Sequence, residues 1–152
     1  MNTIDVVICG CIKNCGSYID SVFENINKIS SLVNVTHIVC SYDKSTDSTL
    51  LKLNEQKNKN PKVHILENHA ELSNMRTVNI SNARNRIYDF LENNHIDPDY
   101  IFMMDFDDVC ANPVNLDVLE NAMKQRKDFD CVSFNNERYY DFWALSFDEF
   151  IF

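Results

Sequence analysis

A regular alternation of apolar runs and amphipathic segments constrains the fold more than any other feature of this sequence. The apolar runs are short and rich in β-branched residues, as in "IDVVICGCI", which is typical of buried strands. The segments between them carry apolar residues at helical spacing. This order predicts an α/β fold with a mainly parallel central sheet and helices on both faces. We expect strands at 4–12, 35–41, 62–67, 99–105 and 130–134, and helices at 17–30, 46–57, 80–94 and 113–127.

Polar residues mark where three of the expected helices begin. Ser17 and Asp20 form a cap-like pair at the first helix. Ser45 or Thr46 is expected to cap the second helix, and Asn112 the last one. Each of these side chains can accept a hydrogen bond from an unpaired backbone N–H of a first turn.

Composition and charge narrow the class of protein. A net charge of −9 and a pI near 4.7 argue against a nucleic-acid partner. The 152 residues, 45% of them hydrophobic, can fill one core, so a single domain over residues 1–152 is expected. The first residues lack the basic start of a signal peptide, and no run approaches the roughly 18 apolar residues of a membrane span. We therefore expect a cytoplasmic protein without a membrane span.

The six cysteines are expected to be reduced. Cys9, Cys11, Cys40 and Cys131 lie in or beside apolar strand-like runs, where a reduced cysteine behaves as a small hydrophobic residue. Cys11 and Cys15 are four residues apart, but no second pair follows at the spacing of a zinc finger. Neither disulfides nor a zinc site is predicted.

A cluster of carboxylates, Asp105, Asp107 and Asp108, follows the fourth predicted strand in "IFMMDFDDV". Ligands of parallel α/β sheets bind beyond the carboxyl ends of the strands, which is where this cluster is expected. Mn²⁺ and Mg²⁺ prefer carboxylate oxygens and leave positions for substrate phosphates. Asp105 and Asp107 are therefore predicted metal ligands, with a solvated acidic loop as the alternative.

Other charged residues are expected near the same edge. Asp43 directly follows the second strand, where its carboxylate can accept a hydrogen bond from a base or ribose or else cap the next helix. Arg84, placed in the first turns of the third helix, suits a phosphate. For Arg76 two roles remain as alternatives, namely that it binds an anion or that it forms a surface ion pair. Arg86 is expected to be an exposed ion-pair partner, and Asp47 only a capping residue.

Four segments in this order resemble a glycosyltransferase of the GT-A fold, over roughly residues 4–147: "VVICGCIKN", "SYDKSTDST", "SNARNRIYDFL" and "IFMMDFDDV". The segment "NNERYYDFWALSF" is also similar to capsule-type mannosyltransferases and to glycosyltransferases of large DNA viruses. The Asn- and Lys-rich composition would suit a viral origin, and for a viral protein the host cytoplasm is expected. "DFDDV" alone resembles haloacid dehalogenase-type phosphatases, which stay a distant alternative because only 43 residues follow Val109.

The resemblance implies a Rossmann-like, metal-dependent enzyme that moves a sugar from a nucleoside-diphosphate sugar to a glycan or another hydroxyl acceptor. It implies that Cys9 and Asp43 hold the nucleotide and that Arg84 lies close to it. It also places Asp105 at the ribose-diphosphate, and Asp105 and Asp107 at Mn²⁺ or Mg²⁺. A UDP-sugar is slightly preferred over a GDP-sugar as donor.

The sequence departs from the family pattern in two places. Tyr42 stands where an acidic residue often precedes Asp43, and the chain stops 21 residues after Cys131, so the acceptor-binding half is expected to be truncated and a further domain to lie beyond Phe152. Asp141, within "YYDFWAL", is the predicted catalytic carboxylate, with a strand-edge polar residue as the alternative. A nucleotide-sugar binding module without activity of its own is the alternative function.

Overall fold

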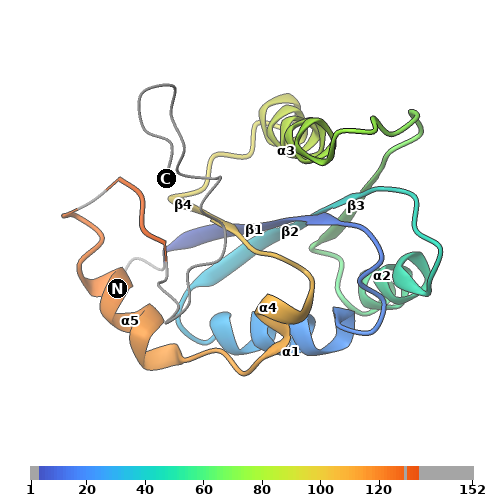
Figure 1. The fold of residues 1–152 in the computed structure, drawn as a ribbon. Coiled ribbons are helices and arrows are strands. Elements are labelled where there is room, and N and C mark those ends of the chain that lie inside the picture. The colour runs from blue at the N-terminus through green and yellow to red at the C-terminus, as the bar shows by residue number, and fades with distance from the viewer. Residues whose placement is uncertain (1–3, 129, 134–152) are drawn as a thin grey trace, which may run out of the picture. The chain divides into compact units, whose positions relative to one another are not determined.

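The computed structural model describes residues 4–128 and 130–133, in which strands and helices alternate (Figure 1). The chain divides into two compact units, Met1–Leu116 and Asp117–Phe152. The elements are β1 (Asp5–Ile12), α1 (Ile19–Ile29), β2 (Asn34–Tyr42), α2 (Thr49–Lys59), β3 (Val63–Glu67), α3 (Arg76–Asn93), β4 (Tyr100–Met103), α4 (Asp108–Ala111) and α5 (Leu116–Lys124).

The described strands form one four-stranded sheet in the order β3-β2-β1-β4, and every pair is parallel. Ile8 of β1 pairs with Ile38 of β2 on one side and with Phe102 of β4 on the other. Because β1 has a neighbour on each side, its apolar residues from Val6 to Cys9 are fully buried. The predicted α/β fold with a parallel sheet is confirmed.

Helices cover both faces of this sheet, as predicted: α3 lies on one face, and α1, α2 and α4 lie on the other (Figure 1). On the α3 side, Ile87 and Leu91 form a buried cluster with Val7, Cys9 and Val39 of the two central strands. Each such aliphatic side chain contributes roughly 1.5–3 kcal/mol to folding. In α1 the predicted apolar stripe is buried and consists of Ile19, Val22, Phe23, Ile26 and Ile29.

The starts of the helices differ from the predictions. Helix α3 begins at Arg76, four residues earlier than expected, because its first turn contains little apolar sequence that a periodicity would reveal. Tyr18 precedes α1 in the capping position and makes no side-chain capping bond, so Ser17 is not the cap. The helix expected from Asn112 to about residue 127 is present as α5, which begins only at Leu116, and Asn112 instead ends the short helix α4.

Three further expectations concern the second half of the chain. Residues 130–133 do not form the expected strand, and residue 134 lies outside the described residues. All six cysteines lie within the described residues and are free, as expected. Within residues 4–128 and 130–133, none of the helices combines the length and apolar character that crossing a membrane requires.

Candidate functional site

The carboxyl end of β1 is surrounded by the charged residues that the sequence singled out. Burial raises the pKa of the Cys11 thiol, the guanidinium groups of Arg84 and Arg86 lower it, and the carboxylates of Asp43 and Asp105 raise it. Cys11 lies near the end of β1, between β2, which Asp43 follows, and β4, which Asp105 follows. The sheet thus gathers side chains from the ends of β2 and β4 and from α3 at one edge.

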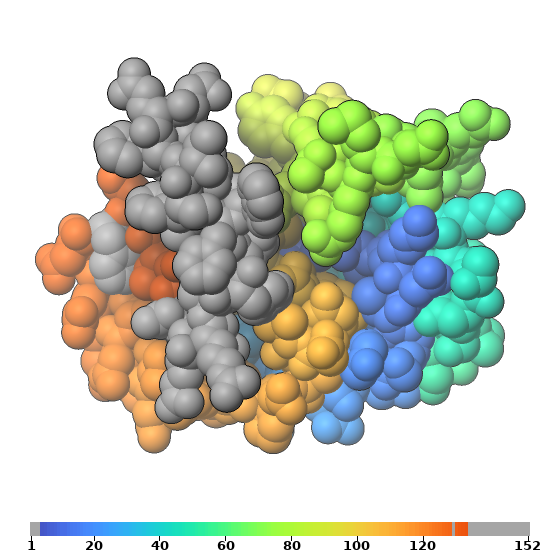
Figure 2. Space-filling view, in the orientation of Figure 1, coloured from blue at the N-terminus to red at the C-terminus, as the bar shows by residue number. Residues whose placement is uncertain are grey.

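The surfaces that carry these residues meet on one side of the first unit. In the space-filling view, α3 (green), the segment after β4 (gold) and the segment after β1 (blue) adjoin one another (Figure 2). This arrangement follows from the parallel sheet, whose loops at the carboxyl ends of the strands all lie at the same edge.

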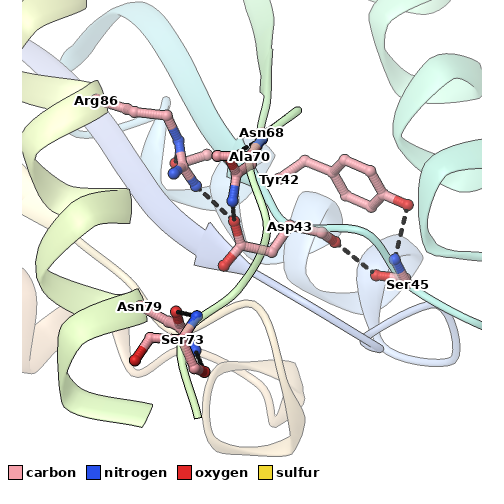
Figure 3. Close-up of polar contacts among 9 residues, drawn as sticks. Tyr42, Asp43, Ser45, Asn68, Ala70, Ser73, Asn79 and Arg86 are labelled. Atoms are coloured by element: carbon pink, nitrogen blue, oxygen red, sulfur yellow. Dashed lines mark hydrogen bonds and ion pairs between the residues drawn. The ribbon is translucent and has the colours of Figure 1, made fainter. Parts of the chain in front are cut away.

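Asp43 is the most firmly held of the predicted site residues. Its backbone N–H donates to the carbonyl of Ile12 at 2.9 Å, which continues the β1–β2 pairing, and the residue is only 7% exposed. One carboxylate oxygen, Oδ1, accepts from Arg86 Nη2 at 2.6 Å and from Asn68 Nδ2 at 2.9 Å (Figure 3). Buried charge is tolerated because it is both paired and hydrogen-bonded.

Arg86 has a different position from the one predicted. It is an ion-pair partner, but its side chain is 24% exposed and lies against the end of β2, where Nε also donates to Ser41 Oγ at 3.2 Å. In the sequence, Arg86 directly precedes Ile87, an apolar residue of the buried stripe of α3. This neighbour was the available signal that Arg86 lies close to the sheet. The guanidinium therefore links α3 to the Asp43 carboxylate.

Arg84 and Arg76 are both exposed. Arg84 lies in the middle of α3 and not in its first turns, because the helix begins earlier than predicted, so the proximity of a helix N-terminus no longer supports its phosphate role. Arg76 is the first residue of α3, and among the described residues it makes no ion pair.

Hydrogen bonds join the loop after β1 to the loop after β2. Asn14, which has a left-handed backbone with φ of 52°, donates from its N–H to Ser45 Oγ at 2.9 Å. Its side-chain oxygen accepts from the Thr46 N–H at 2.9 Å. Ser45 or Thr46 was predicted to cap α2, but Ser45 Oγ instead accepts from Asn14 and donates to the Asp43 carbonyl, and Thr46 donates to Asn14.

Asp47, which precedes the N-cap residue Ser48, bonds both to the first residue of α2 and to the loop after β1. Its carboxylate accepts from the N–H groups of Thr49 at 3.0 Å and Gly16 at 2.9 Å. The Thr49 hydroxyl bond is the largest cause of its lowered pKa. A Cβ at Gly16 would lie 2.5 Å from Ser48 Oγ, so only glycine fits there. The capping interpretation of Asp47 is confirmed.

The aspartate loop, residues 105–108, is held by the apolar residue inside it. Phe106 is 1% exposed and packs edge-on against Phe23 of α1, with ring centroids 5.9 Å apart. Its ring also lies directly on Gly10 of β1, where a Cβ would collide with it. The flanking carboxylates stay nearer the surface: Asp105 is exposed and Asp107 is half-buried.

The strand before this loop is less buried than expected. β4 is an edge strand of the described sheet, and Ile101 is 53% and Met103 46% exposed. The premise that the carboxylates follow a fully buried strand is therefore wrong. Asp107 accepts from the Val109 N–H at 3.0 Å and so caps the short helix α4.

The donor set in the aspartate loop fits a divalent ion that arrives with a phosphate ligand. Among the described residues, no group of three or more His, Cys, Asp or Glu side chains is placed to hold a metal alone. Mg²⁺ in phosphate sites is commonly bound through only one or two carboxylates and the phosphate oxygens. Asp105 and Asp107 supply that number. Burial raises the pKa of the nearby Cys110 thiol, and a protonated thiol is a poor ligand.

A buried amide that the sequence reasoning missed anchors the segment after the aspartate loop. Asn25 of α1 is 3% exposed, and its Nδ2 donates to the carbonyls of Cys110 at 2.8 Å and Asn112 at 2.7 Å. Its Oδ1 accepts from the Val114 N–H at 3.2 Å. A polar residue inside the apolar stripe of α1 was the available signal.

A polar pocket of about 300 Å³ lies between α3 and the loop after β3. That loop is held by reciprocal bonds of 2.8 Å between the Asn79 side chain and the backbone of Ser73 (Figure 3). Arg86 belongs both to this pocket and to the Asp43 ion pair. The other lining residues include Asn68, Glu71, Asn82, Asn85 and Asp89.

Two predicted site residues lie elsewhere. Cys9 is fully buried in the core beneath α3, and burial raises its thiol pKa to about 12. Its thiol therefore does not reach the edge of the sheet, whereas its carbonyl pairs with the Met104 N–H at 2.8 Å. Asp141 lies outside the described residues.

In comparisons with known proteins, no family model and no curated protein matches this chain. The chemistry of the residues at the carboxyl edge of the sheet is therefore the basis for assigning a function.

Proposed function

We propose that this chain is a metal-dependent glycosyltransferase domain of the GT-A type, which uses a nucleoside-diphosphate sugar. The observation that carries the proposal is that Asp43 and Asp105 follow β2 and β4, the two strands that flank β1, at the carboxyl edge of a parallel sheet. This edge is where such sheets bind nucleotides. We call Asp43, Arg84, Asp105 and Asp107 the donor site.

The residues of the donor site are suited to different parts of the donor. The fixed carboxylate of Asp43 accepts a hydrogen bond from the nucleoside, and the exposed guanidinium of Arg84 contacts the diphosphate. Asp105 and Asp107 would hold Mn²⁺ or Mg²⁺. The ion, when bound, supplies positive charge that stabilises the leaving diphosphate.

The reaction exchanges one bond at the anomeric carbon of the sugar. The bond to the diphosphate oxygen breaks, and the nucleoside diphosphate leaves with the electron pair. A bond to the acceptor oxygen forms, and the hydroxyl proton passes to a base. Arg84 stabilises the charge that grows on the leaving group. Asp141 remains the proposed base, on the sequence evidence alone.

The test combines binding and turnover. UDP or GDP should raise the melting temperature of the 152-residue chain more with Mn²⁺ than with EDTA. Release of free sugar from a UDP- or GDP-sugar would then support the enzyme over a binding module without activity. An equal shift in EDTA contradicts the metal role, and the absence of any shift contradicts nucleotide binding.

A further inference from the structure

Two histidines lie side by side on the face of the sheet that α3 covers. His64 of β3 is next to Val39 of β2 in the parallel register. Val39 belongs to the apolar cluster beneath α3, and His37 is two residues before it, so His37 and His64 share that face. Their ring centroids are 5.3 Å apart. We call these two residues the histidine pair.

The histidine pair is separate from the donor site. His37 precedes Asp43 by six residues, and six residues of extended strand span about 20 Å. Both histidines are half-buried, so part of each remains open to solvent. What binds at this pair is therefore independent of what binds at the carboxyl edge of the sheet.

A hydrogen bond determines which nitrogen of His37 has a free lone pair. Thr36 Oγ1 lies 3.3 Å from the carbonyl of Val6, to which its hydroxyl donates. The same oxygen lies 3.1 Å from His37 Nδ1, and since its one proton is already used, it accepts from Nδ1–H. In the neutral ring Nε2 then has no proton. A bond to one ring nitrogen that leaves the other free is the usual arrangement of a metal-binding histidine.

His64 is available in the same way. It makes no hydrogen bond to another residue that the structure describes, so none of those residues competes for its ring nitrogens. Its ring is positioned by packing, with its centroid 5.0 Å from that of Phe90 on α3. Burial, and then the charges of His37 and Lys57, lower the pKa of His64. The imidazole is therefore neutral at pH 7, and a metal ion has no proton to displace there.

The separation of the two rings suits one shared ion. When two imidazoles bind a tetrahedral Zn²⁺, each nitrogen lies about 2.0 Å from the ion and each ring centre about 1.2 Å further, which places the two centres about 5 Å apart. The observed 5.3 Å agrees with that distance. The two histidines come from neighbouring strands, which hydrogen bonds of the sheet hold in register.

We propose that His37 and His64 bind one divalent transition-metal ion of the zinc class. Imidazole nitrogen is a ligand for Zn²⁺, Cu²⁺ and Ni²⁺, whereas Mg²⁺ and Mn²⁺ prefer oxygen, so the two sites of this chain select different ions. The protein supplies two ligands, and water fills the remaining positions. A bound ion joins β2 to β3, the edge strand of the described sheet, and so stabilises the folded chain.

The first experiment records the imidazole nitrogen signals of all four histidines by NMR while ZnCl₂ is added to the full chain under reducing conditions. One unprotonated nitrogen of His37 and one of His64 should shift together and reach a plateau at one equivalent. Because the signals are assigned to individual residues, Zn²⁺ bound at a thiol or at the aspartate loop does not contribute. MgCl₂ at the same concentration should leave them unchanged.

The second experiment repeats the titration on single variants. In His64→Gln, the concentration of Zn²⁺ that half-shifts the His37 signal should rise about a hundredfold or more, because only one ligand remains, and His37→Gln should do the same to His64. Thr36→Val should raise the concentration for both about tenfold, since it removes the bond that orients His37. His69→Gln, at an exposed position in the loop after β3, is the matched control and should change neither.

The outcomes separate the site from simple ring packing. If Zn²⁺ shifts neither histidine at several equivalents, or shifts only one of them, the pair does not share an ion and the proposal is overturned. If His69→Gln weakens the shift as much as His64→Gln, the ion binds elsewhere. An unchanged midpoint in Thr36→Val would remove the positioning role of Thr36. None of these results depends on nucleotide binding, so the proposed function and this site can fail independently.

Discussion

The two ends of the donor site are built in opposite ways. At the end of β2, the Asp43 carboxylate is almost buried and is held by hydrogen bonds from Arg86 and Asn68. In the loop after β4, the carboxylate of Asp105 is exposed, and the side chain that fixes the loop is the apolar Phe106. One end is ordered by polar contacts and the other by packing.

The difference is compatible with what each end is proposed to bind. A carboxylate that recognises one N–H of a base needs a fixed direction, which polar neighbours provide. Carboxylates that bind a divalent ion must replace part of its hydration shell, so they benefit from access to solvent. Phe106 supplies order to the aspartate loop without using any oxygen of Asp105 or Asp107.

The largest effect is expected from removing the packing at the aspartate loop. Phe106→Ala should lower the free energy of unfolding by about 3–5 kcal/mol, because the ring fills the space between Gly10 and Phe23. Urea unfolding measures this loss. Val109→Ala, at a side chain that is 49% exposed, should change it by less than about 0.5 kcal/mol. Equal effects of the two variants would show that the ring does not hold the loop.

A smaller loss is expected at the polar end. Arg86→Met leaves the Asp43 carboxylate without its charged partner and should lower the free energy of unfolding by roughly 2–3 kcal/mol. Arg84→Met, on the same helix but exposed, should cost less than about 0.5 kcal/mol.

Adding Asp43→Asn to Arg86→Met should restore part of that loss, because the unpaired charge is removed. The comparison is made by urea unfolding of the single and double variants. If the double variant is less stable than Arg86→Met by the full cost of Asp43→Asn alone, the two side chains do not interact, and the polar end is not built on this ion pair.

Acidification should lower the free energy of unfolding through the protonation of His64. The ring of His64 on β3 lies 5.3 Å from that of His37 and 5.0 Å from that of Phe90 on α3, between centroids. Burial, and then the charge of His37, lowers the pKa of His64 below its ordinary value of 6.5. The unfolded chain therefore takes up a proton first, and the free energy of unfolding should fall as the pH decreases below about 6.5.

His64→Phe should remove part of this pH dependence, whereas His69→Gln, at an exposed position, should leave it unchanged. Urea unfolding at about pH 7.5 and about pH 5.5 measures the difference. An identical pH dependence in the parent and His64→Phe would show that His64 does not carry it.

The sequence predicted the sheet well because its strands are short apolar runs with clear boundaries. The buried stripe of α1 was equally visible, since its apolar residues recur at helical spacing. The start of α3 was missed because Arg76 and the polar residues after it have no such periodicity. Asn112 follows a one-turn helix, and its capping potential alone could not show on which side the helix lies.

The sequence predicted the residues that we assign to the donor site better than it predicted the contacts of those residues. Asp43 and Asp105 were identified from their positions after strands. The Asp43–Arg86 pair joins residues 43 apart in sequence, so only the packing of α3 on the sheet reveals it. The sequence likewise gave no indication that Phe106 turns inward, because an apolar residue between two aspartates looks like the end of a strand.

The smallest effect on stability, and the sharpest contrast between the two ends, is expected for Asp105→Asn. Asp105 is exposed, so the substitution should change the free energy of unfolding by less than about 0.5 kcal/mol. It should nevertheless remove the extra melting-temperature shift that Mn²⁺ gives with UDP, because a carboxamide is a much weaker ligand for a hard cation. Asp108→Asn is the control, since Asp108 is also exposed and lies three residues further along the same loop. If both variants lose the Mn²⁺ effect equally, the aspartate loop attracts the ion only by its total charge, and the donor site has no specific metal ligand at Asp105.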